Sequence, residues 1–244
     1  KYRDQALRNM RFLLRSFRDD TGQYQHTWKN GQSRYPAFLD DLAFLLQAFL
    51  QLQQVTGDTG WLEEARELVR LILDKYQEPG TPYFFYTPEN QKDVIVRKKE
   101  VYDGALPSGN SVMAACLNHM AVIFDMKEWK EQSLNMYRML GNAIVRYPVS
   151  FGVWAMGVQE LVAGTNEIVL TGDNPEDLRA DLLGRYVPNK VVLTAGKEER
   201  SIPLLWGRKG EGKPSISLCR NNTCQPPVFS ADSLISLINR DKKQ

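Results

Sequence analysis

The sequence has few of the side chains that most often bind metals or build disulfide scaffolds. Its 244 residues include only two histidines and three cysteines. Three cysteines are too few to staple a small secreted domain, and Cys219 and Cys224 lack the tight spacing of zinc or redox pairs. Two readings stay open for this pair: two loop thiols or one structural bridge. We therefore expect an intracellular, cytoplasmic and mostly reduced protein with no bound metal.

Long apolar runs and an excess of charge are also missing. Apolar stretches such as Leu42 to Leu46 fall well short of the ~20 residues needed to cross a bilayer. Lysine and arginine number 31, aspartate and glutamate 29, and the net charge is +2. The basic residues are scattered, whereas a nucleic-acid footprint needs them clustered. We expect neither a membrane nor a nucleic acid as a partner.

What the chain does have is helical periodicity. Residues 37–55 and 109–124 are apolar around most of the helix circumference, which is typical of enclosed helices. The segments that follow them open at Trp61 and Trp129 and carry one apolar stripe and one charged face, which is typical of surface helices. The repeated order predicts pairs of inner and outer helices arranged in concentric rings.

Two further helices, at 1–17 and about 150–162, bring the total to five or six. Between the first helix and the first pair, alternating aromatic residues lead to Asn30-Gly31, a hairpin signal. The predicted fold class is mainly α: residues 1–163 form a partial (α/α)6 toroid, its second half. Because the chain opens in helix register without a methionine, we expect the first half to precede Lys1.

After Gly164 the period changes from helical to alternating. We expect residues 164–244 to form a small C-terminal α/β element packed on the helical part. Its predicted core is a strand–helix–strand unit, followed by two more strands and a closing helix. These elements are expected at 167–171, 175–186 and 190–194, then at 202–206, 215–219 and 231–239.

The most informative stretch is 103–111, where a polar turn leads into an enclosed helix. Asp103 places a carboxylate beside Ser108 and Asn110, which offer a hydroxyl and an amide at the helix N-terminus. Such an end suits polyhydroxylated or anionic ligands. The alternative is that these residues only end one segment and cap the next.

Asp40 and Asp41 open the first inner helix. Adjacent residues diverge by roughly 100° around a helix, so at most one of the two carboxylates faces the centre of a ring. That carboxylate is a candidate general acid or base, or an acceptor for sugar hydroxyls. Glycosidase chemistry needs a second carboxylate, for which Asp103 is the candidate. The alternative is that both aspartates only stabilise the helix dipole and cap helix ends.

His26 and Trp28 lie on the short β-excursion. His26 is the candidate base, and Trp28 offers an aromatic face of the kind that stacks on sugars. His119 lies within an enclosed helix and is expected to be a hydrogen-bonded residue of the core or of the lumen. Residues 207–213 have the glycine and lysine spacing of a phosphate loop, but Pro214 replaces the required Ser or Thr. We therefore expect a surface hairpin there and no cofactor.

Three ordered motifs resemble one family. They are Phe38-Leu39-Asp40-Asp41-Leu42-Ala43-Phe44, Asp103-Gly104-Ala105-Leu106-Pro107-Ser108-Gly109-Asn110-Ser111, and Cys219-x4-Cys224-Gln225-Pro226-Pro227-Val228. Together they are similar to the C-terminal half of the thioredoxin-domain proteins related to spermatogenesis-associated protein 20. Leu42 departs from the pattern, because relatives often carry tyrosine there.

The resemblance implies a thioredoxin-like domain and the first half of the toroid in the intact protein. It also implies a toroid similar to N-acylglucosamine and cellobiose 2-epimerases and to six-hairpin glycosidases, which points to carbohydrate metabolism by fold analogy.

Our leading hypothesis is a carbohydrate-active toroid of epimerase or glycosidase type that binds a sugar-like small molecule. Asp40 or Asp41, Asp103 and His26 would be catalytic, and Trp28, Ser108 and Asn110 would bind substrate. The alternative is a redox-linked binding or quality-control protein. In it the toroid is a non-catalytic recognition cup, and Cys219 and Cys224 exchange with the thioredoxin-like domain.

Overall fold

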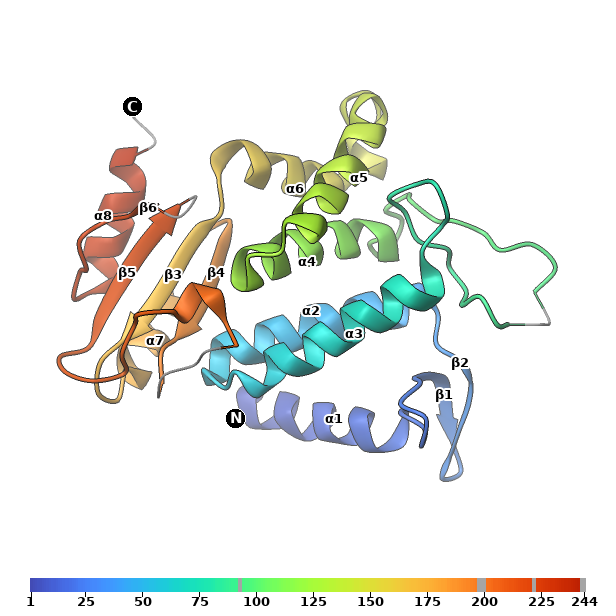
Figure 1. Cartoon of the computed structure of the whole chain (residues 1–244), viewed down its shortest axis with the longest axis horizontal. Coiled ribbons are helices and arrows are strands. Elements are labelled where there is room, and N and C mark those ends of the chain that lie inside the picture. The colour runs from blue at the N-terminus through green and yellow to red at the C-terminus, as the bar shows by residue number, and fades with distance from the viewer. Residues whose placement is uncertain (92–93, 197–200, 221–222, 242–244) are drawn as a thin grey trace.

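A computed structural model describes residues 1–91, 94–196, 201–220 and 223–241 of the chain. Helices stacked side by side form the N-terminal part, and a sheet with two covering helices forms the C-terminal part (Figure 1). The helices of the first part are α1 (Tyr2–Ser16), α2 (Leu39–Thr56), α3 (Gly60–Tyr76), α4 (Gly109–Phe124), α5 (Lys127–Arg146) and α6 (Gly152–Ala163).

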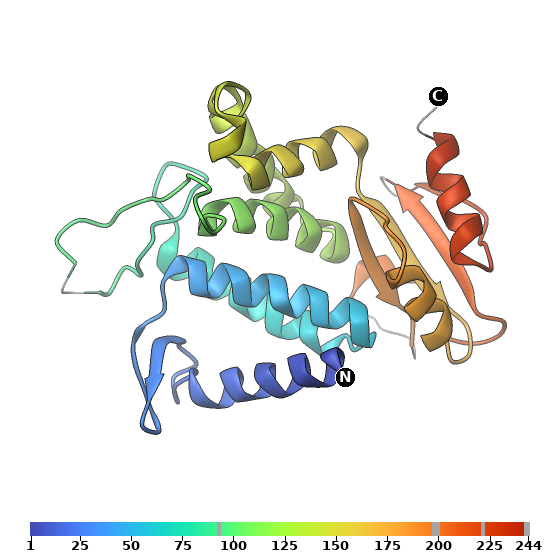
Figure 2. The ribbon, with the colours of Figure 1, turned by 180° about the vertical axis from the view of Figure 1, so that it is seen from behind.

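Two helical hairpins form the centre of this part. Helix α2 packs on α3 and α4, and α4 packs in turn on α5 and α6. Leu46 and Phe49 of α2 and Met113 and Leu117 of α4 are fully buried, as expected for enclosed helices. Helices α2, α4 and α6 run in one direction, and α1, α3 and α5 run in the other (Figures 1 and 2). The predicted pairs of enclosed and surface helices are therefore present.

The β-excursion is a two-stranded antiparallel hairpin, β1 (Gln25–Lys29) and β2 (Gln32–Pro36). Asn30 and Gly31 connect the strands with φ of 53° and 79°. Two successive positive φ values are what the tightest hairpin turn requires, and Asn-Gly supplies them at the lowest cost. The hairpin signal in the sequence is confirmed.

The C-terminal element is a four-stranded sheet in the order β4-β3-β5-β6. Strand β3 pairs in parallel with β4 and antiparallel with β5, so the predicted strand–helix–strand unit forms. Val169 faces the helical core, whereas Ile168 and Leu170 face a second core beneath the two covering helices. The elements are β3 (Asn166–Thr171), α7 (Glu176–Leu183), β4 (Lys190–Thr194), β5 (Ser215–Arg220), β6 (Thr223–Cys224) and α8 (Ala231–Asp241).

Two details of this element differ from the expectation. The predicted strand at 202–206 is wrong: Pro203–Leu205 form a 3-10 helix, η2, which fits a proline with no N–H to give to a sheet. The helix predicted to reach residue 186 ends at Leu183, ahead of Gly184. Residues 207–213 form a loop without strands, in place of the expected hairpin.

The fold is mainly α with a small α/β element, as predicted. None of the helices in the described ranges is long and apolar enough to cross a membrane.

Candidate functional site

The N-termini of helices α2, α4 and α6 meet at one end of the helical part, which we call the rim. The Gly109 amide at the start of α4 donates to Asp40 Oδ1 on α2 at 2.8 Å. The Val153 amide at the start of α6 donates to Asp103 Oδ2, also at 2.8 Å. The polar turns that lead into these helices therefore gather at the same end, opposite the α/β element (Figures 1 and 2).

His26 and Asp41 form a close pair at the rim. Asp41 Oδ2 accepts a hydrogen bond from the Phe38 amide at 2.8 Å and lies 2.7 Å from His26 Nδ1. Since a carboxylate only accepts, Nδ1 carries the shared hydrogen, and in a neutral imidazole Nε2 then holds a free lone pair. Both side chains are more than one third exposed. The pair has the form of a general base oriented by a carboxylate.

Asp40 lies next to this pair and has a different environment. Burial raises the pKa of its carboxyl, the Gly109 amide lowers it in part, and the negative charges of Asp41 and Glu100 raise it further. Its Oδ1 is occupied by Gly109, while Oδ2 has no hydrogen-bond partner among the described residues. The start of α2 therefore carries a carboxyl with a raised pKa and, on the next residue, a carboxylate that orients an imidazole, which are the group types of an acid and a base.

Gly109 makes this approach of two helices feasible. A β-carbon at this position would lie 2.5 Å from Asp40 Oδ1 and 2.9 Å from the Cγ of Leu39. Only glycine leaves room for the carboxylate to reach the α4 N-terminus.

Sequence reasoning missed two aromatic residues beside the carboxylates. Phe38 stacks on Tyr86 with ring centroids 4.7 Å apart, and on its other side lies 4.5 Å from the His26 ring. Burial raises the pKa of the Tyr86 hydroxyl, and the charges of Asp40 and Asp41 raise it further. The signal was the aromatic run at 83–86, which has no helical or strand period.

Asp103 and Ser108 are engaged in holding helix starts. Asp103 accepts hydrogen bonds from the Ser108 amide at 3.0 Å, the Ser111 hydroxyl at 2.6 Å and the Val153 amide at 2.8 Å. Ser108 is the N-cap of α4, because its hydroxyl accepts from the Ser111 amide, and it is 2% exposed. Capping, the alternative weighed for this stretch, accounts for all of these contacts.

Asn110 is likewise fully paired. It is 0% exposed, its Oδ1 accepts from the Phe84 amide, and its Nδ2 donates to the Phe84 and Glu100 carbonyls. A buried amide with three backbone partners fixes the long connection from α3 to α4 against the rim.

Trp28 lies apart from the carboxylates. Its ring packs edge-on against Phe12 of α1, with centroids 5.3 Å apart. Between α1, β1 and α2 is a groove of about 310 Å³, largely apolar, with His26 and Asp41 in its wall. The structure therefore brings His26 into contact with Asp41, leaves Asp40 beside Asp41 at the start of α2, and places Trp28 outside these contacts.

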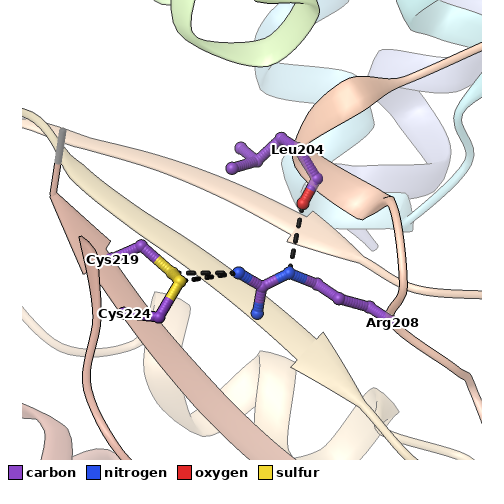
Figure 3. The surroundings of a disulfide bond; sticks show 4 residues. All are labelled: Leu204, Arg208, Cys219 and Cys224. Atoms are coloured by element: carbon purple, nitrogen blue, oxygen red, sulfur yellow. Dashed lines mark hydrogen bonds between the residues drawn. A yellow bond between two sulfur atoms is a disulfide. The ribbon is translucent and has the colours of Figure 1, made fainter. Parts of the chain in front are cut away.

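Cys219 and Cys224 form a disulfide, which decides between the two open readings in favour of a bridge. They are directly paired residues of β5 and β6. Arg208 donates from one guanidinium nitrogen to both sulfurs, at 2.9 Å and 3.2 Å, and from Nε to the Leu204 carbonyl (Figure 3).

His119 is hydrogen-bonded, as predicted, and its side chain is 21% exposed. Its Nε2 lies 2.9 Å from Glu160 of α6, which also accepts from the Thr165 hydroxyl. Burial opposes ionisation of Glu160, yet the hydrogen bond and charge of His119 outweigh it and hold the pKa of this carboxyl below its usual value. Within the described ranges, no three His, Cys, Asp or Glu side chains are grouped to hold a metal ion.

No protein-family model matches the chain. Spermatogenesis-associated protein 20 of Rattus norvegicus is 28% identical to it over 257 residues, which cover 97% of this chain and 32% of that protein. The same-named protein of Mus musculus is 28% identical over 256 residues, with the same coverage of each chain. An uncharacterized protein of Caenorhabditis elegans is 28% identical over 255 residues, which cover 98% of this chain and 35% of the relative.

The chain spans about a third of the length of the curated relatives it matches. Over almost its whole length it resembles spermatogenesis-associated protein 20, as the three sequence motifs predicted.

Proposed function

We propose that this chain forms part of a carbohydrate-active protein, of epimerase or glycosidase type, whose acid–base groups lie at the rim. The observation that carries the proposal is the 2.7 Å contact between His26 and Asp41 beside Asp40, whose pKa is raised. His26 is the base in this scheme, and Asp40 in its protonated form is the acid.

The surroundings of these groups support a ligand with several hydroxyls. Asp40 Oδ2 and His26 Nε2 are left without partners among the described residues. His26 Nε2 accepts a hydrogen bond from a hydroxyl, and Asp40 Oδ2 donates one when the carboxyl is protonated and accepts one when it is ionised. The stacked rings of Phe38 and Tyr86 offer an aromatic surface next to them. The backbone around this site is fixed by three further residues. Asp103 and Ser108 hold the helix starts, and Asn110 holds the connection from α3 to α4.

We also propose that the helices belong to an (α/α)6 toroid that the intact polypeptide closes. Half of such a ring requires three inner helices that run in parallel. Helices α2, α4 and α6 run in parallel, and each lies next to an outer helix or at an edge of the helical part. Apolar side chains are exposed on α6, where Met156 is 67% and Val162 84% exposed. The thioredoxin-like domain remains part of this proposal through the sequence resemblance.

The experiment uses the intact polypeptide and a panel of hexoses, N-acetylhexosamines and disaccharides. We expect one class to raise Tm and to exchange the proton next to the sugar carbonyl with deuterium, followed by NMR. Aryl glycosides test the hydrolytic variant of the same chemistry.

Matched variants link the result to the rim. His26→Gln and Asp40→Asn should abolish exchange or hydrolysis, because they remove the base and the acid. Asp20→Asn is the control, since this aspartate is exposed and forms no hydrogen bond or ion pair with the described residues. A panel without any sugar-dependent change in Tm, exchange or hydrolysis refutes the proposal.

A second function is favoured by a different observation. The contact of Arg208 with both disulfide sulfurs supports the redox-linked alternative, in which the helices form a recognition cup and Cys219 and Cys224 exchange with a thioredoxin-like domain.

A further inference from the structure

The two cysteines of the bridge differ sharply in exposure. Cys219 lies on the central part of the sheet and is 1% exposed, whereas Cys224 lies on the short edge strand β6 and is exposed. An external thiolate therefore reaches the Cys224 sulfur far more readily than the Cys219 sulfur. Access alone makes Cys224 the sulfur that is attacked and Cys219 the leaving group.

Arg208 favours that direction of cleavage. Its guanidinium lies 2.9 Å from the Cys219 sulfur and is held in place by the Leu204 carbonyl (Figure 3). A disulfide sulfur is a weak acceptor, but a thiolate carries a full negative charge. The same contact is therefore much stronger after the bond breaks, and it stabilises the reduced pair.

The sulfurs border a recess of about 250 Å³. Trp206, which is 63% exposed, lies in its wall and offers an apolar surface to an incoming protein. Glu167 and Asp125 also line the recess, and their negative charges oppose a thiolate there. Arg208 is the group in direct contact with the sulfurs, so its effect is expected to exceed theirs.

We propose that Cys219–Cys224 is a reversible redox centre that a protein dithiol reduces by attack on Cys224, with Arg208 holding Cys219 as the thiolate. The inference deepens the second function proposed above and is independent of the sugar site.

The step balances as a thiol–disulfide exchange. A thiolate of the dithiol bonds to the Cys224 sulfur, the Cys219–Cys224 bond breaks, and the electron pair leaves with Cys219. The second thiol of the reductant, as its thiolate, then attacks the mixed disulfide and releases Cys224, which takes a proton. Two electrons pass to the pair, and the reductant ends as a disulfide.

The first test finds the attacked sulfur in the unaltered intact polypeptide, with glutathione as a monothiol probe. Trypsin cuts after Arg220 and not between Lys213 and Pro214, so Cys219 lies in peptide 210–220 and Cys224 in peptide 221–240. After brief exposure, acid quenching and blocking of free thiols, mass spectrometry is expected to find the glutathione adduct on 221–240. An adduct on 210–220 overturns the proposed direction.

The second test measures the reduction equilibrium of the pair in glutathione buffers, with the tryptic peptides of Cys219 and Cys224 as readout; in Lys209→Gln the first of these begins at residue 209. Arg208→Gln is expected to make reduction about tenfold less favourable, or ~30 mV for a two-electron couple. Arg208→Lys keeps a cation and should recover most of that loss. Lys209→Gln removes an adjacent exposed charge and should leave the equilibrium unchanged.

The outcomes separate this inference from the broader function. Equal equilibrium constants for the unaltered protein and Arg208→Gln overturn the role of Arg208, even if the pair is redox-active. A pair that stays oxidised at every glutathione ratio and forms no adduct removes both the inference and the redox-linked function.

Discussion

Replacing Asp103 with alanine removes the group that joins the starts of α4 and α6. Its carboxylate accepts from the Ser108 amide, the Ser111 hydroxyl and the Val153 amide, at 2.6 to 3.0 Å. The Ser108 and Val153 amides lie at the starts of two helices, where they have no partner within their helix. With alanine at position 103, these two amides lose their acceptor and can be satisfied only by water in a half-buried turn.

The expected cost follows from these contacts. Loss of a helix-capping acceptor costs ~1 kcal/mol, and two helices lose one here. The hydroxyl contact with Ser111 adds about 1 kcal/mol. We therefore expect Asp103→Ala to lower the free energy of unfolding by about 3 kcal/mol, which for a chain of this size lowers Tm by roughly 6–12 °C.

Thermal and urea unfolding followed by circular dichroism measure this loss. Asp20→Ala is the matched control, because it removes an exposed aspartate that has no hydrogen bond or ion pair within the described ranges. A loss below about 1 kcal/mol would show that the capping contacts contribute little. A variant that keeps its stability but loses sugar binding and turnover would place Asp103 in the sugar site, where the sequence hypothesis makes it a catalytic carboxylate.

Three further predictions concern packing, pH and the edge of the helical part. Gly109→Ala should destabilise the protein by about 2–4 kcal/mol, because the β-carbon of the alanine would overlap Asp40. Gly141→Ala, in open space on α5, is the control and should be neutral or stabilising by up to ~1 kcal/mol in the same unfolding assay. Folding lowers the pKa of Glu160, so the stability that this carboxylate contributes is present at neutral pH and is lost as the pH falls through the folded pKa. Between pH 6 and 3, Glu160→Gln should therefore lose less stability than the unaltered protein. Met156→Lys, on the exposed face of α6, should change the stability of this 244-residue chain by less than ~0.5 kcal/mol, and a clear loss in the intact polypeptide alone would support closure of the ring.

Much of the fold was readable from the sequence because periodicity is a direct record of burial. The all-round apolar segments became α2 and α4, and Asn30-Gly31 became the hairpin turn because two positive φ values leave few other choices of residue. The strand predicted at 202–206 failed because a short apolar run carries no period of its own, and Pro203 decided the local backbone.

The site was only partly readable. The sequence indicated which polar residues stand at helix starts, but the partners of each atom depend on how the helices pack. Asn110 is the clearest case, since its side-chain amide is fully used by the backbone of Phe84, 26 residues away, and of Glu100, ten residues away. Tyr86 was missed for the converse reason: its neighbours Asp40 and Asp41 are brought to it only by tertiary contacts.

The carboxylates at the rim share one physical role before any chemistry is considered. Parallel inner helices bring their N-termini, each with unpaired amides and a positive dipole end, to the same place, and such an assembly needs anions. Asp41 binds the amide before α2, Asp40 links α2 to α4, and Asp103 links α4 to α6.

These contacts between helix starts explain why carboxylates gather in the motifs 38–44 and 103–111, as they would in an active site, whether or not catalysis occurs there. What capping does not explain is the remainder: the uncommitted oxygen of Asp40, and the His26 ring held against Asp41 by a contact that no helix end requires. Function at the rim therefore has to rest on those atoms, and the variants that decide it are His26→Gln and Asp40→Asn.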